Sequence, residues 1–140
     1  MCKCCQKSIV IAEIAPKAIG PYSAGVKAGH LLYTAGQVGL IPETGALVEG
    51  GIEIETSQAL VNLRAILEAG GTDLEHVVKT TVFLKDINEF AKMNAVYGQF
   101  FTENPPARSA FQVAALPKGA AVEIEAVAVI PCGDSECDCK

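Results

Sequence analysis

The chain has two arginines, and the local sequence explains only one of them. Arg64 lies in a helical pattern with Glu68 four residues further on, a spacing that favours an exposed ion pair. Arg108 lies in the apolar segment 105–113, which predicts a buried strand. Because burying an unpaired cation is unfavourable by several kcal/mol, Arg108 needs an anionic partner.

Two interpretations of that partner follow from the residues alone. The chain turns at 116–119 and returns on a second strand, where Glu123 and Glu125 lie on one face, about 7 Å apart. One of these carboxylates could form a fixed cross-strand ion pair with Arg108. Alternatively, Arg108 binds the carboxylate of a ligand, a task that suits its planar fork of N–H donors.

A tyrosine is the remaining candidate for a polar pocket. Tyr22 follows the Gly20-Pro21 turn, which presents it on a loop, although it could also cap the core. One arginine, one carboxylate and a tyrosine, without a nucleophile or metal ligands, suit a small acid whose reaction needs only water and proton transfer. Hydrolysis of a reactive C=N bond is such a reaction.

Motifs for other chemistries are missing from the sequence. There is no H-E-x-x-H, no G-x-S-x-G, no Walker-type loop and no dinucleotide-binding G-x-G-x-x-G. His30 and His76 are far apart in sequence, and each is interpreted as an ordinary strand-end or turn residue rather than a ligand. No cofactor is expected.

Composition limits the class of protein. At 140 residues and 50% hydrophobic, the chain is expected to form one domain. Its net charge of −5 disfavours nucleic-acid binding. No apolar leader or membrane-spanning stretch is evident, which favours a cytoplasmic protein. The mean hydropathy of +0.31 is high for a small monomer and predicts that other subunits cover part of the surface.

All the cysteines lie in two tails, at residues 1–7 and 131–140, outside the expected domain of residues 8–130. They are Cys2, Cys4, Cys5, Cys132, Cys137 and Cys139. A disulfide framework in the core is therefore not expected, and the spacings do not match a C-x2-C zinc knuckle. The tails either bind a soft metal or cross-link, or they have no role in folding.

The hydrophobic pattern predicts an α+β domain. Strands are expected at 8–15, 24–28, 30–34, 77–84, 107–113 and 121–130, the last of them central because both its faces are largely apolar. A helix is expected from Ile52 to the Gly70-Gly71 stop, and a second from Asp86. The second helix turns one face inward: Phe90, Met93, Asn94, Tyr97, Phe100 and Phe101.

Two further expectations complete this fold. Thr72 and Glu75 have the spacing of a capping box. The order of elements predicts one sheet with two helices on one face, so a second or third copy of the chain is expected to cover the other face.

The segment P-A-R-S-A-F-Q-V-A-A-L-P-K-G-A-A-V-E-I-E resembles the signature of the RidA/YjgF family of enamine/imine deaminases. Further matches are A-I-G-P-Y-S at 18–23, T-A-G-Q at 34–37, V-K-T-T-V-F-L-K-D at 78–86, and residues 94–101. The resemblance extends from about residue 8 to residue 130.

The resemblance implies a chorismate-mutase-like fold, a homotrimer with the sheets facing inward, and clefts between subunits. It further implies that Arg108 binds the carboxylate of a 2-imino acid of the 2-aminoacrylate/2-iminopropanoate class, and that Glu123 positions or activates water. Tyr22 would come from the neighbouring chain and the backbone at Ala110 would meet the imine nitrogen. The same pocket would include Gly36 and Gln37 on a loop and Phe90 on the apolar wall. The products would be a 2-oxo acid and ammonia.

The sequence departs from the family pattern at one site position. Many members have Cys two residues after the arginine, where this chain has Ala110; the backbone role survives, but regulation through a thiol there is lost. The cysteine-rich tails are not part of the pattern either. Two other functions stay open: a small-carboxylate-binding regulatory trimer without turnover, and a ribonuclease or translation inhibitor, which the acidic charge disfavours.

Overall fold

The computed structural model describes residues 6–133, which form a single domain with one sheet. The strands are β1 (Lys7–Val10), β2 (Gly25–Ala28), β3 (Leu31–Thr34), β4 (Val77–Leu84), β5 (Ala107–Gln112) and β6 (Val122–Val129). The helices are α1 (Ile52–Ala69) and α2 (Phe90–Phe100), with short 3-10 turns η2 (Leu74–His76), η3 (Ile87–Glu89) and η4 (Pro117–Gly119).

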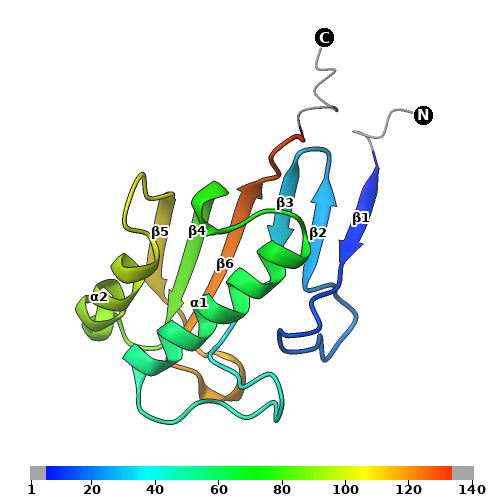
Figure 1. The fold of residues 1–140 in the computed structure, drawn as a ribbon. Coiled ribbons are helices and arrows are strands. Elements are labelled where there is room, and N and C mark those ends of the chain that lie inside the picture. The colour runs from blue at the N-terminus through cyan, green and yellow to red at the C-terminus, as the bar shows by residue number, and fades with distance from the viewer. Residues whose placement is uncertain (1–5, 134–140) are drawn as a thin grey trace.

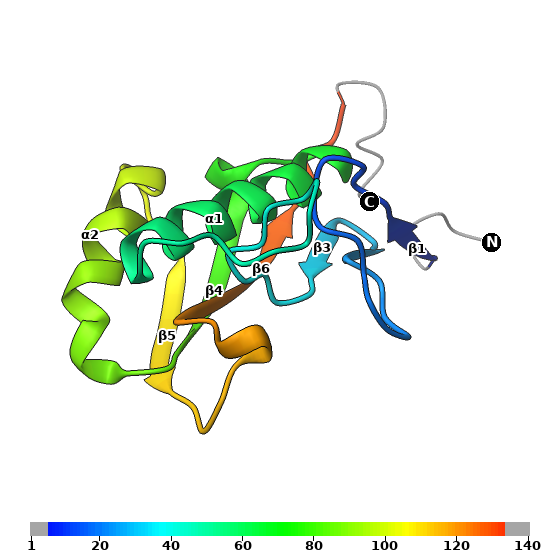
Figure 2. The same cartoon turned by 90° about the horizontal axis from the view of Figure 1, so that it is seen from below.

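The strands of this sheet are arranged in the order β1-β2-β3-β6-β4-β5 (Figure 1). The β4–β5 pair is parallel and the other pairs are antiparallel, so the sheet is mixed. Both helices lie on the same face of the sheet (Figure 2). The predicted α+β architecture, with two helices on one face and the last strand at the centre, is confirmed.

The core forms between α1 and the alternate residues of β6. Val122, Ile124, Ala126 and Ala128 point toward the helices and are buried. Helix α1 supplies the other side of this layer with Leu60, Leu63, Ile66 and Leu67, all fully buried. This spacing of three and four residues is the apolar stripe expected from the sequence.

Two local expectations are wrong. The first strand ends at Val10 rather than at residue 15, because it pairs only with β2, which is four residues long. The capping box at Thr72 does not form. Instead, the Asp73 side chain accepts from the His76 backbone N–H at 3.2 Å, while the Thr72 hydroxyl donates to the Val129 carbonyl at 2.6 Å.

The expected burial of the strand that contains Arg108 is also wrong for the isolated chain. Strand β5 is an edge strand that pairs only with β4, and most of its residues are exposed. On α2, Met93 and Tyr97 are buried as expected, but Asn94 is exposed. The reason is the same in both cases, because no strand or helix among residues 6–133 lies beyond β5 to cover that edge of the sheet.

The face of the sheet opposite the helices carries exposed apolar side chains. Tyr33 is 46% exposed, Phe111 is 46% exposed and Val129 is 37% exposed. Their strand registers place them on the same face as Glu123 and Glu125. We refer to this surface as the open face. That another copy of the chain covers it stays a prediction.

Candidate functional site

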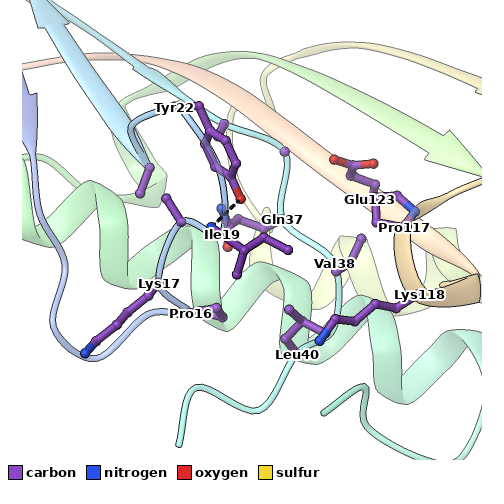
Figure 3. A pocket seen from close by; sticks show the side chains of 14 residues that line it. Pro16, Lys17, Ile19, Tyr22, Gln37, Val38, Leu40, Pro117, Lys118 and Glu123 are labelled. Carbon is purple, nitrogen blue, oxygen red and sulfur yellow. Dashed lines mark hydrogen bonds between the residues drawn. The ribbon is translucent and has the colours of Figure 1, made fainter. Parts of the chain in front are cut away.

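A pocket of about 310 Å³ opens beside the start of β6. It is lined by residues 16–24, by residues 35–40 that follow β3, by Pro117-Lys118 and by Glu123. Figure 3 shows Tyr22 and Glu123 on different sides of this hollow, with Gln37 and Val38 between them. Four of the site residues expected from the sequence therefore meet here: Tyr22, Gly36, Gln37 and Glu123.

The backbone after β3 holds Gly36 against Glu123. Gln37 exchanges two backbone hydrogen bonds with Ile124, at 2.8 and 2.9 Å, next to Glu123 on β6. A Cβ atom at position 36 would overlap the Glu123 carboxylate and approach its Cδ to 2.8 Å. Glycine at this position therefore leaves the space that the carboxylate occupies.

Tyr22 does not cap the core. Its side chain is 51% exposed and stands over the pocket, where its hydroxyl accepts from the Ile19 backbone N–H at 3.4 Å (Figure 3). The phenol is thus held at the pocket rim by its own loop, and it can donate its proton to a ligand.

The environment of Glu123 favours its neutral form. Burial raises the pKa of this carboxyl above the usual 4.5, and the nearby Glu125 carboxylate raises it further. Because the working pKa of a general acid or base is best placed near the operating pH, this shift moves Glu123 toward a proton-transfer role.

From the raised pKa of Glu123 we predict how the stability of the protein depends on pH. A carboxyl whose pKa is higher in the folded than in the unfolded state binds protons more tightly when folded, so its ionisation destabilises the protein as pH rises above about 4.5. We expect Glu123→Gln to unfold at higher urea concentration than the wild type near neutral pH, and the difference to disappear at low pH. Urea midpoints measured across this range would check it, with Glu68→Gln, an exposed change on α1, as the control. Parallel pH profiles for wild type and Glu123→Gln would contradict it.

Helix α1 anchors the pocket loop through a residue that the sequence did not single out. Asn62 is fully buried and its amide donates to the carbonyls of Val38 at 3.2 Å and Leu40 at 2.9 Å. Its side-chain oxygen accepts from Gln58 at 2.9 Å. An asparagine among the mostly apolar buried residues of α1 is the only signal for this role in the sequence.

We expect Asn62→Ala to lower the free energy of unfolding by about 2 kcal/mol or more, because two carbonyl groups of the pocket loop lose their donor inside the protein. Urea unfolding would measure it. The matched control is Gln58→Ala, which removes one partly buried hydrogen bond from the same network and should have a smaller effect. An Asn62→Ala variant as stable as Gln58→Ala would contradict this role.

Arg108 lies in a second cluster, between β5 and α2. Its Nη1 donates to Asn94 Oδ1 at 2.8 Å, and its guanidinium carbon lies 4.6 Å from the centre of the Tyr97 ring and 5.4 Å from that of Phe90. Within residues 6–133 no carboxylate is within ion-pair distance of Arg108. The internal pair with Glu123 or Glu125 is therefore absent from this part of the chain. Phe90, which was expected on the apolar wall of the substrate pocket, lies beside Arg108 in this cluster.

The backbone of β5 adds donors to this cluster. The Val113 N–H donates to the Leu84 carbonyl at 2.9 Å, so the odd-numbered residues of this strand face β4. The alternate residues, Arg108 and Ala110 among them, direct their N–H and C=O groups to the outer edge. The backbone N–H expected to meet a ligand at Ala110 is thus on the exposed side of an edge strand.

The two clusters lie on opposite faces of the sheet in one chain. Arg108 is opposite Thr80 on β4, which is opposite Ala126 on β6, and both of these are buried beneath the helices. Glu123 is three residues from Ala126 and points to the open face. Two strand spacings and three residues separate Arg108 and Glu123 by roughly 14 Å. One chain therefore does not bring them onto one small molecule.

Neither a metal-binding cluster nor a membrane-spanning helix is found among the described residues. Between residues 6 and 133 no group of three or more His, Cys, Asp and Glu side chains is arranged to hold a metal ion. No described helix is both long and apolar enough to cross a bilayer. Of the tail cysteines, only Cys132 is described; Cys2, Cys4, Cys5, Cys137 and Cys139 lie outside the described residues.

The chain is similar to proteins of known family. The family model described as Endoribonuclease L-PSP matches residues 12–130. A human protein named 2-iminobutanoate/2-iminopropanoate deaminase is 51% identical over 123 residues, which are 88% of this chain and 90% of the human protein. A RutC family protein of Pyrococcus horikoshii is 52% identical over 122 residues, 87% of this chain and 97% of that protein.

Solved structures of related proteins show the same similarity. The structure of E. coli TdcF with bound serine superposes with a TM-score of 0.83 at 42% identity, over 87% of this chain and 98% of that one. The resemblance inferred from the sequence motifs and the fold that it implied for the single chain are both confirmed.

Proposed function

We propose that the protein hydrolyses reactive 2-imino acids, on the premise that the chain belongs to the Endoribonuclease L-PSP family, which includes RidA and RutC proteins. Relatives about half identical to this chain carry the name 2-iminobutanoate/2-iminopropanoate deaminase. The observation that carries the proposal is the pair of half-sites. One holds a cation without an anionic partner among residues 6–133, and the other holds a carboxyl with a raised pKa.

The active site lies between two chains of a homotrimer. Arg108, Phe90 and the Ala110 backbone form one half on the exposed edge of β5, and Tyr22, Gly36, Gln37 and Glu123 form the other half in the pocket. Because the halves of one chain lie on opposite faces of its sheet, the half from a neighbour must complete each site. The exposed apolar residues of the open face and the unpaired edge of β5 support such an assembly.

Arg108 binds the substrate carboxylate in this site. Asn94, Tyr97 and Phe90 hold the guanidinium in place, so its remaining donors are available to grip a carboxylate through two parallel hydrogen bonds. The outward N–H of Ala110 donates to the substrate beside it. Fixing the acid at both points orients the imine carbon toward the half-site that contains Glu123.

Glu123 moves the protons of the reaction. Its carboxylate takes a proton from water as the water oxygen bonds to the imine carbon, and the C=N electron pair goes to nitrogen. The proton is then returned to nitrogen. Glu123 then takes the hydroxyl proton and passes it to the amine nitrogen as the C–N bond breaks, so that ammonia leaves and the hydroxyl oxygen becomes the carbonyl of the 2-oxo acid. Tyr22 holds the water or the leaving nitrogen by a hydrogen bond, and no cofactor takes part.

The direct test generates the substrate in place. A serine dehydratase converts serine to 2-aminoacrylate and 2-iminopropanoate in the presence of semicarbazide, which traps the imine unless it is hydrolysed first. The protein should speed pyruvate release and lower semicarbazone formation. The proposal would be contradicted if the semicarbazone yield were unchanged at both catalytic and stoichiometric concentrations of the protein.

A second function has its own support. The TdcF structure holds bound serine, a small carboxylate, which agrees with a binding trimer that performs no turnover. Glu123→Gln separates the two functions, because it preserves shape while removing the proton acceptor. For an enzyme we expect turnover to fall about a hundredfold or more, while affinity for a stable 2-oxo acid changes little. Calorimetric titration and the coupled assay would measure the two quantities. A binder would show no turnover in either protein.

The family description also names an endoribonuclease. The net charge of −5 argues against it, because non-specific RNA binding depends on neutralising phosphates with Lys and Arg. RNA that stays intact and unbound at low salt would exclude this function.

A further inference from the structure

A buried pair of hydroxyl groups lies beside Arg108. The Thr80 Oγ1 and Tyr97 Oη atoms are 2.7 Å apart, so one of them donates a hydrogen bond to the other. Thr80 is fully buried and Tyr97 is 5% exposed. Thr80 belongs to β4 and Tyr97 to α2, so this bond joins the sheet to the helix that covers it. Neither hydroxyl takes part in the proposed reaction.

The hydrogen bond holds the aromatic ring on which the guanidinium rests. The guanidinium carbon of Arg108 is 4.6 Å from the centre of the Tyr97 ring, within the range of cation–π attraction. The Phe101 ring packs against the same tyrosine, with 4.6 Å between the ring centres. Because Tyr97 is bound at its hydroxyl end and packed along its ring, it offers the cation a fixed surface.

Strand pairing places Thr80 in the right position for this bond. Thr80 is opposite Arg108 in the parallel pair of β4 and β5, so their side chains leave the sheet on the same face. On α2, Asn94 precedes Tyr97 by three residues and accepts from Arg108 Nη1 at 2.8 Å. The guanidinium is therefore held at one nitrogen by Asn94 and over its plane by a ring that is bonded to the neighbouring strand.

Tyr97 supports the cation as a neutral group. Burial raises the pKa of the Tyr97 hydroxyl above its usual 10.0, and the opposing effects of the Thr80 hydrogen bond and of the Arg108 charge are smaller. The phenol thus keeps its proton at neutral pH and adds no negative charge beside Arg108. The charge of the guanidinium stays available for the carboxylate of a ligand.

Stability alone does not explain why this pair is polar. Valine and phenylalanine have nearly the shapes of threonine and tyrosine, and replacing both partners of a buried hydrogen bond by apolar groups of the same shape is close to neutral for stability. An apolar pair would lack only the directional bond that fixes the ring. The feature that the two hydroxyls add is therefore the orientation of Tyr97, and through it that of Arg108.

We propose that Thr80 and Tyr97 are positioning residues for Arg108. Their hydrogen bond fixes the Tyr97 ring, and the ring holds the guanidinium in the orientation that binds the carboxylate of a 2-imino acid. The identity of this ligand rests on the proposed function, whereas the ordering of Arg108 does not. Two residues that touch no substrate thereby set the affinity of the site for it.

The first test uses the double variant Thr80→Val/Tyr97→Phe, which keeps the side-chain shapes and removes both hydroxyls. It should unfold at about the same urea concentration as the wild type. Its affinity for pyruvate, measured by calorimetric titration, should fall at least about fivefold. In the coupled assay KM should rise by a similar factor while kcat changes little. Thr80→Ser, which keeps the hydroxyl, should retain most of the affinity.

The same change in an Arg108→Ala background separates positioning from a general effect on the fold. There, removal of the two hydroxyls should cause no further loss of kcat/KM, because no guanidinium is left to be positioned. The protein concentration is raised so that the slower reaction can be measured. An equal loss with and without Arg108 would overturn the proposal, and so would a double variant with the pyruvate affinity of the wild type.

Nuclear magnetic resonance of the ¹⁵N-labelled protein tests the ordering of Arg108 without any ligand. The chain has two arginines, so two side-chain Nε–Hε signals are expected, and Arg64→Lys identifies the one that belongs to Arg108. Relaxation of this signal should show restricted motion in the wild type and faster motion in the double variant. Unchanged motion would contradict the positioning role. A wild type that neither binds pyruvate nor hydrolyses the imine would contradict the proposed function, while the motion of Arg108 would still decide the role of the hydroxyl pair.

Discussion

Replacing Arg108 by alanine should lower kcat/KM for the imine substrate by about a hundredfold or more, because the substrate carboxylate loses the guanidinium that binds it in the proposed site. Arg108→Lys should recover a small part of the lost kcat/KM, since an ammonium keeps the charge but not the paired donors of the guanidinium. The coupled dehydratase assay with semicarbazide gives kcat/KM, and titration with a 2-oxo acid gives the accompanying loss of affinity.

The matched control for Arg108 is the other arginine of the chain. Arg64 is exposed on α1, with its guanidinium carbon 6.0 Å from the centre of the Phe100 ring. Arg64→Ala removes the same charge and should leave the kinetics unchanged. If Arg108→Ala were as active as Arg64→Ala, the carboxylate would have to bind elsewhere and the site assignment would be lost.

Two inactive variants should restore activity to each other when they are produced together. Arg108→Ala destroys the half-site on β5, and Glu123→Gln destroys the half-site in the pocket. If each active site takes its halves from different chains, every mixed trimer has both halves intact in one of its three sites, which is about a quarter of all sites before the unmixed trimers are removed. Co-production with two affinity tags and tandem purification isolates the mixed oligomers, and their turnover is compared with that of each parent.

The geometry also supplies the negative control. Tyr22 and Glu123 line the same pocket of one chain, so mixed oligomers of Tyr22→Phe and Glu123→Gln should not recover turnover. Every site in that mixture lacks either the phenol or the carboxylate. Recovery in this second pair, or none in the first, would show that the halves are not combined across chains in the proposed way.

The apolar pattern of the chain was sufficient to predict the core. The residues of α1 and β6 that face each other repeat at the periods of a helix and a strand, and this local regularity is what the sequence encodes directly. The motifs around Arg108 and Glu123 also identified the family. The type and order of the residues in a motif can be recognised without knowing how the strands pair. Errors occurred at edges, as in β1 and β5, where the extent of pairing depends on a neighbour that lies elsewhere in the chain or outside it.

The sequence by itself therefore determined the elements, the family and the chemical types in the site. Only the tertiary structure decided which of them meet. Arg108 and Glu123 are 15 positions apart in sequence, yet β4 lies between their strands, and their side chains point to opposite faces. The insertion of β4 between β5 and β6 is a long-range pairing that no local pattern reports. It separates the cation from the carboxylate, and for that physical reason the proposed active site needs two chains.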